Sequence, residues 1–458
     1  MLSRLLAHPL PVDPFALRVT HAAGEENRLG DFVLYWAQSA RRLRQNLGLE
    51  HAIARANALG VPVVVYEALR PDYPYANDRI HAFVLDGVAQ NRRDADARGL
   101  RYLFFLPRTR DEARGVVRRL AARAQLVVTD DFPTGIVRDQ TRAFAARTPV
   151  ALELVDGNGI VPMRAMPKEQ YAAKQFRDRA YKLLDRHWTP IRDSEARRFF
   201  AGGFDVAETL PPLAECDIDH SIAPVATKGG GDVALACLDA FVRDGLTGYA
   251  TSHSKSAKHT SGLSPYLHFG HLGIHEIVER VLASGAPAED VDAFLEQAVI
   301  RRELSSNLCF FNEQHDSLDA LPDWAKKTLD AHRGDRRKPV YDAAELEAAA
   351  THDDVWNLAQ QQLVRTGTMH GYLRMLWGKK AIEWMETPEA AHAFLIEQHA
   401  RYALDGRDPN THAGVLWCFG KHDRPWAPQR PIFGMIRYMS SESTRKKVRL
   451  AEIAASMS

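Results

Sequence analysis

The chain of 458 residues contains only four cysteines, and they lie far apart, at Cys216, Cys237, Cys309 and Cys418. None forms a CxxC pair or stands near histidine at the spacing of zinc ligands, so we expect reduced thiols and no metal site. No stretch approaches the roughly 18 apolar residues that cross a bilayer. The segment before Asp31 lacks the apolar run and cleavage site of a secretion signal. The sequence therefore predicts a cytoplasmic protein without a membrane partner.

The sequence also lacks an excess of either charge, since the formal net charge is +1. This excludes a uniformly basic protein but leaves room for a local basic face. The first half of the chain has no GxGxxG and no P-loop, so it offers no support for a dinucleotide site. We expect a monomer.

The first half does contain short apolar runs that alternate with helical periodicity. The runs are Phe32–Trp36, Val61–Tyr66, Tyr102–Leu106, Leu126–Thr129 and Val150–Val155. Runs this uniformly apolar are typical of strands covered on both faces. The segments between them, such as Arg41–Leu59, Ile80–Arg98 and Arg110–Arg123, have the spacing of helices. Residues 31–156 are therefore predicted to form an α/β domain with a parallel, Rossmann-like sheet.

The remainder divides into three parts. Residues 1–30 are interpreted as an N-terminal extension, partly disordered or lying across the surface. Residues 157–232 are interpreted as an interdomain linker that contains a charged helix at Lys168–Trp188. From residue 233 to 458 the strand signal disappears and helical runs follow one another, which predicts an all-α domain.

A hydroxyl-rich loop, Thr260-Ser261-Gly262-Leu263-Ser264, precedes a short helical segment. Pro265 fits the first helical position, with Ser264 as N-cap. Hydroxyls and free N–H groups at a helix start favour phosphate binding. The plainer alternative is ordinary helix capping.

Three tryptophans, Trp356, Trp377 and Trp384, fall within 29 residues. Trp377 and Trp384 are seven apart, which places them on one helix face. They either fill a core or form an electron-hopping path from a buried redox cofactor to the surface. The second interpretation requires rings in near contact, with one ring exposed.

Arg374 lies in the same helical run, and Asp405 begins a turn after the next one. A buried Arg–Asp pair is costly unless something compensates it. A cation here would stabilise a cofactor that becomes anionic on reduction. The alternative is a surface turn.

Basic clusters are usually solvated surface, but interleaved aromatics can turn them into a face for DNA phosphates and bases. The residues concerned are Arg301-Arg302, Arg333–Lys338, Arg445–Arg449, Lys421, Trp417 and Trp426.

Taken in order, six strings between Tyr249 and Met439 closely resemble class II cyclobutane pyrimidine dimer photolyases. They are TSGLSPYLHFG, RRELSSNLCFF, THDDVWNLAQQQLV, GTMHGYLRMLWGKKAIEW, YALDGRDPN and PIFGMIRYMS. The first half matches only in architecture and in the strand FVLYW. The resemblance implies FAD in the helical domain and light-driven electron transfer to a flipped-out pyrimidine dimer in DNA. It also implies a second, antenna chromophore of the deazaflavin type, for which we find no diagnostic residues.

The resemblance implies roles for individual residues as well. Those expected at the FAD phosphates are Tyr249, Thr260, Ser261, Gly262, Leu263 and Ser264. Those expected around the isoalloxazine ring are Arg374, Asp405, Gly406, Arg407 and His399. The electron path is expected to run from Trp377 through Trp356 to Trp384, with Tyr341 as an accessory. The residues expected at the DNA lesion are Trp417, Met375, Gln297, Arg301 and Lys421.

Two departures from the family pattern bear on repair. Gln297 stands where a glutamate is usual, and an amide has no acidic proton to offer the lesion. His399 stands where an asparagine is usual, beside N5 of the flavin, and an imidazole that titrates near neutrality can change which flavin state accumulates. Arg301 stands where some members have tryptophan and other class II members also have arginine. The alternatives to a repair enzyme are a cryptochrome-like blue-light receptor with a signalling partner, and a flavin-binding protein with neither activity.

Overall fold

The computed structural model describes residues 1–9, 12–204, 206, 208 and 210–457. Its contacts divide the chain into two compact units. Unit 1 comprises Met1–Pro167, Ala180–Asp239 and Leu263–Gly285, and unit 2 comprises Lys168–Arg179, Ala240–Gly262 and Ala286–Ser458. The division therefore runs through both the predicted linker and the predicted helical domain.

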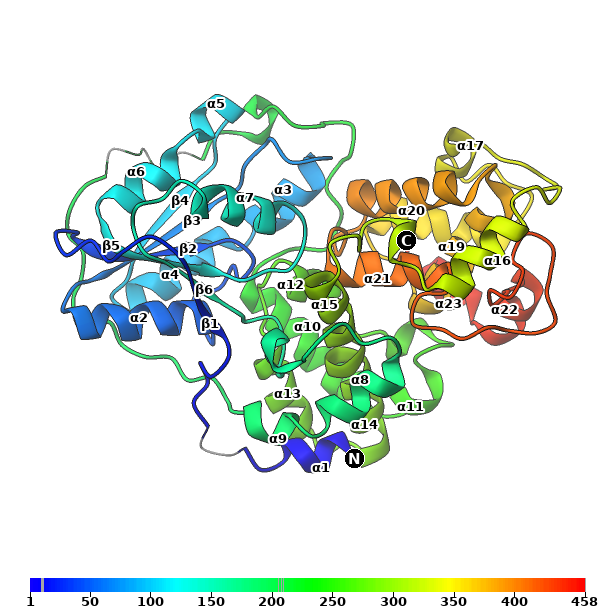
Figure 1. The fold of residues 1–458 in the computed structure, drawn as a ribbon, viewed down its shortest axis with the longest axis horizontal. Helices are drawn as coiled ribbons and strands as arrows, with labels where there is room; N and C mark the ends of the chain where they lie inside the picture. Colours follow the sequence, from blue (N-terminus) through cyan, green and yellow to red (C-terminus); the bar gives the residue numbers. More distant parts are fainter. Residues whose placement is uncertain (10–11, 205, 207, 209, 458) are drawn as a thin grey trace. The chain divides into compact units, whose positions relative to one another are not determined.

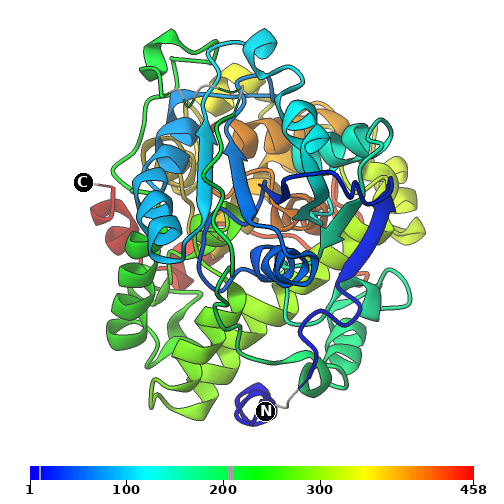
Figure 2. The ribbon, with the colours of Figure 1, turned by 90° about the vertical axis from the view of Figure 1, so that its left-hand side faces the viewer.

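Unit 1 is built on a six-stranded sheet of order β1-β6-β5-β2-β3-β4 (Figures 1 and 2). The strands are β1 (Val19–Ala23), β2 (Phe32–Ala37), β3 (Val63–Ala68), β4 (Arg101–Phe105), β5 (Ala124–Asp130) and β6 (Leu152–Val155). Four of the five pairings are parallel, and only the edge strand β1 runs antiparallel to its neighbour β6. The predicted Rossmann-like sheet is confirmed, and β2 to β6 each lie within a few residues of a predicted apolar run.

Helices cover both faces of this sheet, which explains the uniformly apolar strands. In β2, Val33 and Tyr35 pack into one core with α2 (Leu47–Leu59) and α4 (Val88–Ala97). Leu34 and Trp36 pack into the other core with α6 (Val116–Ala122) and α7 (Gly135–Ala145). Alternate side chains of one strand point to opposite faces, so both sets must be apolar. The helices that follow the strands are α2 (Leu47–Leu59), α3 (Asp78–Leu85), α4 (Val88–Ala97), α5 (Arg110–Ala113), α6 (Val116–Ala122) and α7 (Gly135–Ala145).

The described part of the N-terminal extension contains a short helix and a strand. Helix α1 (Leu2–Leu6) buries Leu2 and Leu6, and the indole of Trp188 donates a hydrogen bond of 2.8 Å to the carbonyl of Leu6. Strand β1 pairs with β6 from Val19 opposite Val155. The sequence VTHAA has no apolar run because no residue of this edge strand is fully buried.

The carboxyl ends of β2 and β5 meet where the strand order reverses, the usual place for a ligand in an open α/β sheet. Here the carboxylate of Asp130 accepts hydrogen bonds from the hydroxyl of Tyr35 at 2.8 Å and from the backbone N–H groups of Gln38, Ser39 and Ala40 at 2.9, 2.7 and 3.0 Å. These amides are the groups that a phosphate would need. The chain's own carboxylate thus occupies them, in agreement with the missing dinucleotide motif.

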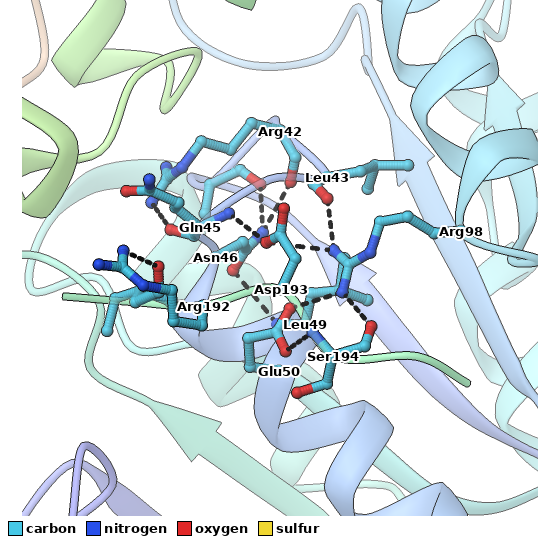
Figure 3. A network of polar contacts seen from close by, with 12 residues as sticks. Arg42, Leu43, Gln45, Asn46, Leu49, Glu50, Arg98, Arg192, Asp193 and Ser194 are labelled. Carbon is cyan, nitrogen blue, oxygen red and sulfur yellow. Dashed lines mark hydrogen bonds and ion pairs between the residues drawn. The ribbon is translucent and has the colours of Figure 1, made fainter. Parts of the chain in front are cut away.

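A polar network anchors the start of α2 to the segment around Asp193 (Figure 3). Arg98 donates to the carbonyl of Leu43 at 2.5 Å and pairs with Glu50 at 2.7 Å. Glu50 accepts the backbone N–H of Ser194 at 2.8 Å. Because Arg98 and Glu50 are both largely buried and mutually paired, the network satisfies the charges that α2 carries into the core.

The rest of unit 1 is irregular or helical. Its regular elements are η1 (Met163–Ala165), α9 (Leu184–His187), η2 (Leu213–Glu215), the beginning of α10 (Gly231–Asp244), α12 (Ser264–His268) and α13 (Ile274–Leu282). The single charged helix expected over Lys168–Trp188 is wrong, because α8 (Ala173–Ala180) ends before α9 begins.

All regular elements described in unit 2 are helical. After α8 and the end of α10 they are α11 (Tyr249–Ser252), η3 (Ala257–His259), α14 (Ala288–Leu295), the π-helical η4 (Glu296–Arg301), α15 (Arg302–Phe311), η5 (Leu318–Ala320), α16 (Asp323–Ala331), α17 (Ala343–Glu347), α18 (Asp354–Thr366), α19 (Gly371–Trp384), α20 (Pro388–Tyr402), α21 (Pro409–Cys418), α22 (Ser441–Lys447) and α23 (Leu450–Ala455). Within the described ranges, none of the chain's helices is long and apolar enough to span a bilayer.

Local signals set the ends of the helices that matter below. Asp353 caps α18 by accepting the N–H groups of Val355 and Trp356, both at 3.1 Å. Gly367 ends α18 in the left-handed conformation, with φ 71°. The short turn that follows returns the chain as α19, which packs against α18.

Candidate functional site

The structure brings Arg374 of α19 and Asp405, in the turn after α20, into a two-pronged ion pair. The two N–O distances are 3.2 and 3.1 Å. The side chains are 25% and 11% exposed, so the pair is neither sealed in a core nor free in solvent. A guanidinium held in this way can still present its open face to a bound group.

The turn that carries Asp405 is fixed by its neighbours. Gly406 lies so close to α20 that an added β-carbon would stand 2.1 Å from the carbonyl oxygen of His399. Thr411 donates its hydroxyl to the carbonyl of Asp405 at 3.1 Å, and Asp408 caps α21 through the N–H of Asn410. Arg407 follows Gly406 in the left-handed region, with φ 67°. The carboxylate is thereby held in a defined place relative to His399.

His399 lies in the last turn of α20 and is 3% exposed. Burial, assisted by the positive charge of Arg374, lowers the pKa of its imidazole to about 4. Its Nδ1 lies 2.7 Å from the carbonyl of Leu395, so Nδ1 carries the hydrogen and Nε2 keeps a lone pair. The expectation of an imidazole that titrates near neutrality is therefore wrong: at neutral pH this side chain accepts a hydrogen bond but has no proton to spare.

A continuous series of aromatic rings begins at His399. Its imidazole meets the ring of Trp377 edge-on, with centroids 5.2 Å apart. Trp377 stacks with Trp356 at 6.5 Å, Trp356 meets Trp384 at 5.7 Å, and Trp384 meets Tyr341 at 5.5 Å. The rings are in the near contact that electron hopping requires.

The three indoles are all buried, with exposures of 1%, 0% and 2% for Trp377, Trp356 and Trp384. No tryptophan of the series reaches solvent, so the exposed ring that the path needs is not an indole. Tyr341 is half-buried and its neighbour His352 is exposed. The series therefore meets water at this pair.

The indole N–H groups point to neutral acceptors. Trp356 donates to the carbonyl of Trp377 at 3.0 Å, and Trp377 donates to the side-chain amide of Gln360 at 2.9 Å. Gln360 in turn donates to Gln398 at 2.8 Å. Neither acceptor takes up a proton readily, so a positive charge on these rings is not lost by deprotonation and stays mobile. Sequence reasoning missed both glutamines, although Gln360 is one helical turn from Trp356.

Of the residues expected at the DNA lesion, Arg301 packs against the ring of Trp417. The guanidinium of Arg301 lies 5.1 Å from the centre of this ring and 3.4 Å from Glu296, which Arg177 also binds with two contacts of 2.9 and 2.5 Å. Gln297 and Arg301 belong to the π-helical η4, and Gln297 is exposed. Wide π turns are rare and occur frequently at functional sites. Met375 of α19 is half-buried.

Lys421 does not fit the expected DNA contact. The residue is 7% exposed, and its ammonium group lies 2.5 Å from the carboxylate of Glu169 and 2.6 Å from the carbonyl of Ala320. These partners occupy the charge that a phosphate would otherwise bind, so Lys421 joins segments of unit 2 to one another.

The residues expected at the FAD phosphates are divided between the two units. Thr260, Ser261 and Gly262 belong to unit 2, whereas Leu263 and Ser264 belong to unit 1. Ser264 is the first residue of α12 and not its cap; the capping position is Leu263, without a side-chain hydrogen bond. Tyr249 in α11 is buried, with its ring stacked on His253 at 4.7 Å.

The donor set in unit 2 fits a flavin. A flat ring that becomes electron-rich on reduction is matched by the Arg374 cation, by the neutral acceptor His399 and by an indole in contact with that acceptor. In the described part of the chain, no cluster of three or more His, Cys, Asp or Glu side chains could hold a metal ion.

Comparisons with known proteins agree with this chemistry. The family model "DNA photolyase" matches residues 33–196. A deoxyribodipyrimidine photo-lyase of Methanothermobacter thermautotrophicus is 37% identical over 95% of this chain and 97% of its own length. Among solved structures, a Synechocystis cryptochrome has a TM-score of 0.70 at 14% identity, over 91% of this chain and 86% of that one.

A photolyase of Sulfolobus tokodaii, described as containing two FAD molecules, has a TM-score of 0.63 at 16% identity, over 91% of this chain and 87% of that one. At these identities the two structures show a shared fold alone. The long match to the Methanothermobacter relative settles the family: the chain belongs to the DNA photolyase family.

Proposed function

We propose that the protein binds FAD beside Arg374, Asp405 and His399 and uses light to repair cyclobutane pyrimidine dimers in DNA. The observation that carries the proposal is the unbroken series of rings from His399 to Tyr341. Its first member, His399, is influenced by the charges of Arg374 and Asp405. Bound FAD would supply the light-absorbing one-electron donor. Family membership supports the cofactor and the chemistry.

The residues of the chain then have distinct tasks. Arg374 places a positive charge next to the ring and lowers the energy of its electron-rich form, while Asp405 orients the guanidinium. His399 offers a hydrogen-bond acceptor and no proton. The indoles deliver electrons from the surface during photoreduction, and their neutral hydrogen-bond acceptors keep the charge moving.

Trp417, Met375, Gln297 and Arg301 are proposed to meet the flipped-out lesion. Trp417 is half-buried, so part of its ring is available for packing against bases. The exposed amide of Gln297 can both donate to and accept from a pyrimidine. Arg301, already at the ring of Trp417, adds a positive charge for the DNA backbone.

The residues proposed to contact the phosphates of FAD, as the family resemblance implies, are Thr260, Ser261, Gly262, Leu263, Ser264 and Tyr249. We also propose a second, antenna chromophore of the deazaflavin type. The Sulfolobus structure, described as having a second FAD that implies a light-harvesting cofactor, supports the idea of an antenna. An absorption spectrum of the purified protein tests this: an additional near-ultraviolet or violet band is expected beside the flavin bands.

A blue-light receptor is the second candidate, favoured by Gln297 and His399 at positions where the family pattern has Glu and Asn. The test is to reduce the flavin chemically, irradiate the protein with dimer-containing DNA and follow the recovery of thymine absorbance. The repair proposal expects recovery in both the wild type and Trp377→Phe, because chemical reduction bypasses the indoles. No recovery with fully reduced flavin abandons repair in favour of the receptor.

A further inference from the structure

The electron path ends on a tyrosine that touches a histidine. The hydroxyl of Tyr341 lies 2.8 Å from Nδ1 of His352, and the two rings stack at 5.9 Å with planes 17° apart. His352 also contacts the last indole directly, because its ring centroid lies 5.3 Å from the ring centroid of Trp384. Three rings that can exchange an electron or a proton thus meet at one point near the surface.

The hydrogen bonds define the direction of proton movement. The backbone N–H of His352 donates to the phenol oxygen of Tyr341 at 2.9 Å. This oxygen therefore already accepts one hydrogen bond, and its own hydrogen is directed to Nδ1. Nδ1 is then the acceptor, and Nε2 carries the hydrogen of the imidazole. Because His352 is exposed, a proton taken up by the ring can pass on to water.

The charges around Trp384 favour this exit. The ammonium group of Lys380 lies 5.4 Å from the centre of the indole, and Glu383 pairs with it at 2.7 Å. A positive charge close to an oxidised, positively charged indole raises the energy of that state, and the neighbouring carboxylate offsets part of this effect. Transfer of the charge to Tyr341 relieves the repulsion if the phenol proton leaves at the same time.

We infer that His352 is the proton acceptor for Tyr341 in a coupled step that completes the electron path. The inference rests on the proposed function, since light-driven electron transfer to the flavin supplies the oxidant, the Trp384 radical cation. Tyr341 gives one electron to this cation, its O–H bond breaks, and the proton goes to Nδ1 of His352, which releases a proton from Nε2 to water. The products are neutral Trp384 and a neutral tyrosyl radical. Without the base, loss of an electron would leave a positively charged phenol, a strong acid that is costly to form.

The test is transient absorption after a blue flash on the FAD-loaded, oxidised protein. In the wild type the tryptophanyl cation should decay as the tyrosyl radical rises, more slowly in deuterium oxide. In His352→Phe, which keeps an aromatic ring, and in His352→Gln, the initial tryptophanyl signal should be unchanged but the tyrosyl yield should fall at least about tenfold. Added imidazole should restore part of that yield in His352→Gly. Tyr341→Phe should lose the tyrosyl signal. Tyr438→Phe, which removes a tyrosine whose ring centre lies 5.6 Å from the ammonium group of Lys380, should keep it.

A nitrogen-15 NMR spectrum of the histidines gives a readout independent of light. Nδ1 of His352 should have the shift of an unprotonated acceptor, and Tyr341→Phe should change that shift. An Nδ1–H tautomer in the wild type, or a wild-type tyrosyl yield in His352→Gln, overturns the role of His352. Absence of any tryptophanyl signal in the wild type overturns the proposed path itself, which is a different result.

Discussion

Replacing His399 by asparagine should remove one defined contribution to the acid sensitivity of the helical unit. The pKa of the imidazole is about 4 in the folded protein, against 6.5 for an unperturbed histidine. Because the folded-state pKa is the lower one, the unfolded chain binds a proton first as the pH falls. The stability contributed by the neutral ring is therefore complete above about pH 6.5 and is lost progressively towards pH 4.

The size of the effect follows from the two pKa values. For a single group with these values, the unfolded state gains about 2 kcal/mol on the folded state when the pH falls from about 7.5 to about 5. His399 is almost completely buried, so solvent screening reduces this figure little. Asparagine does not titrate, and His399→Asn should lose about 2 kcal/mol less stability than the wild type over this range.

Urea unfolding at the two pH values, followed by far-ultraviolet circular dichroism and by fluorescence of released flavin, measures the difference. His412→Asn is the matched control, because burial also lowers the pKa of His412 to about 4 and this residue lies in the same unit. It should show a comparable change in acid sensitivity with an unchanged flavin spectrum, whereas His399→Asn should change both. If the wild type and His399→Asn lose stability in parallel, the neutral buried imidazole is refuted.

Further outcomes are expected. Trp377→Phe should abolish or strongly slow photoreduction while FAD stays bound, and Trp324→Phe, whose indole binds Tyr171 outside the path, should not; equal photoreduction rates would place the path elsewhere. Gly406→Ala should cost roughly 1–3 kcal/mol of unfolding free energy and perturb the flavin spectrum because its β-carbon meets the His399 carbonyl, whereas Gly371→Ala, which meets no atom within 4 Å, should do neither. Arg374→Lys should weaken FAD retention roughly tenfold, measured by equilibrium dialysis, because one of two hydrogen bonds to Asp405 is lost; unchanged retention would separate the pair from the flavin. Lys421→Met should lower the unfolding free energy by roughly 1–3 kcal/mol and leave the salt dependence of DNA binding unchanged. Arg301→Met should reduce the salt dependence of DNA binding. The reverse pattern would show that Lys421 contacts DNA.

Much of the α/β unit could be predicted because its signal is local. A strand covered on both faces must be apolar at every position, as in β2, and such runs are visible in one sequence. Strand β1 was not predicted because VTHAA is stabilised by pairing with β6, which lies more than a hundred residues away in the sequence. The break between α8 and α9 was also missed, because the helical periodicity of the sequence continues across it.

The candidate site shows the same limit. The positions of Trp377 and Trp384 on one helix face follow from their spacing. Their contact with Trp356 depends on how α18 packs on α19 after Gly367, and the acid strength of His399 depends on burial by several elements. The partner of Lys421, Glu169, precedes it by some 250 residues, so no local pattern distinguishes this buried lysine from a surface one.

The capture of the loop amides by Asp130 changes what the α/β unit can hold. In many folds of this architecture a nucleotide binds at this position. Here an anion could bind to these amides only by displacing the carboxylate of Asp130, which already accepts hydrogen bonds from Tyr35 and three backbone N–H groups. These hydrogen bonds connect the end of β5 to β2 and the loop after it, so Asp130→Asn should lower the stability of the α/β unit. An antenna chromophore in this half of the protein would therefore need a binding site that does not use those amides.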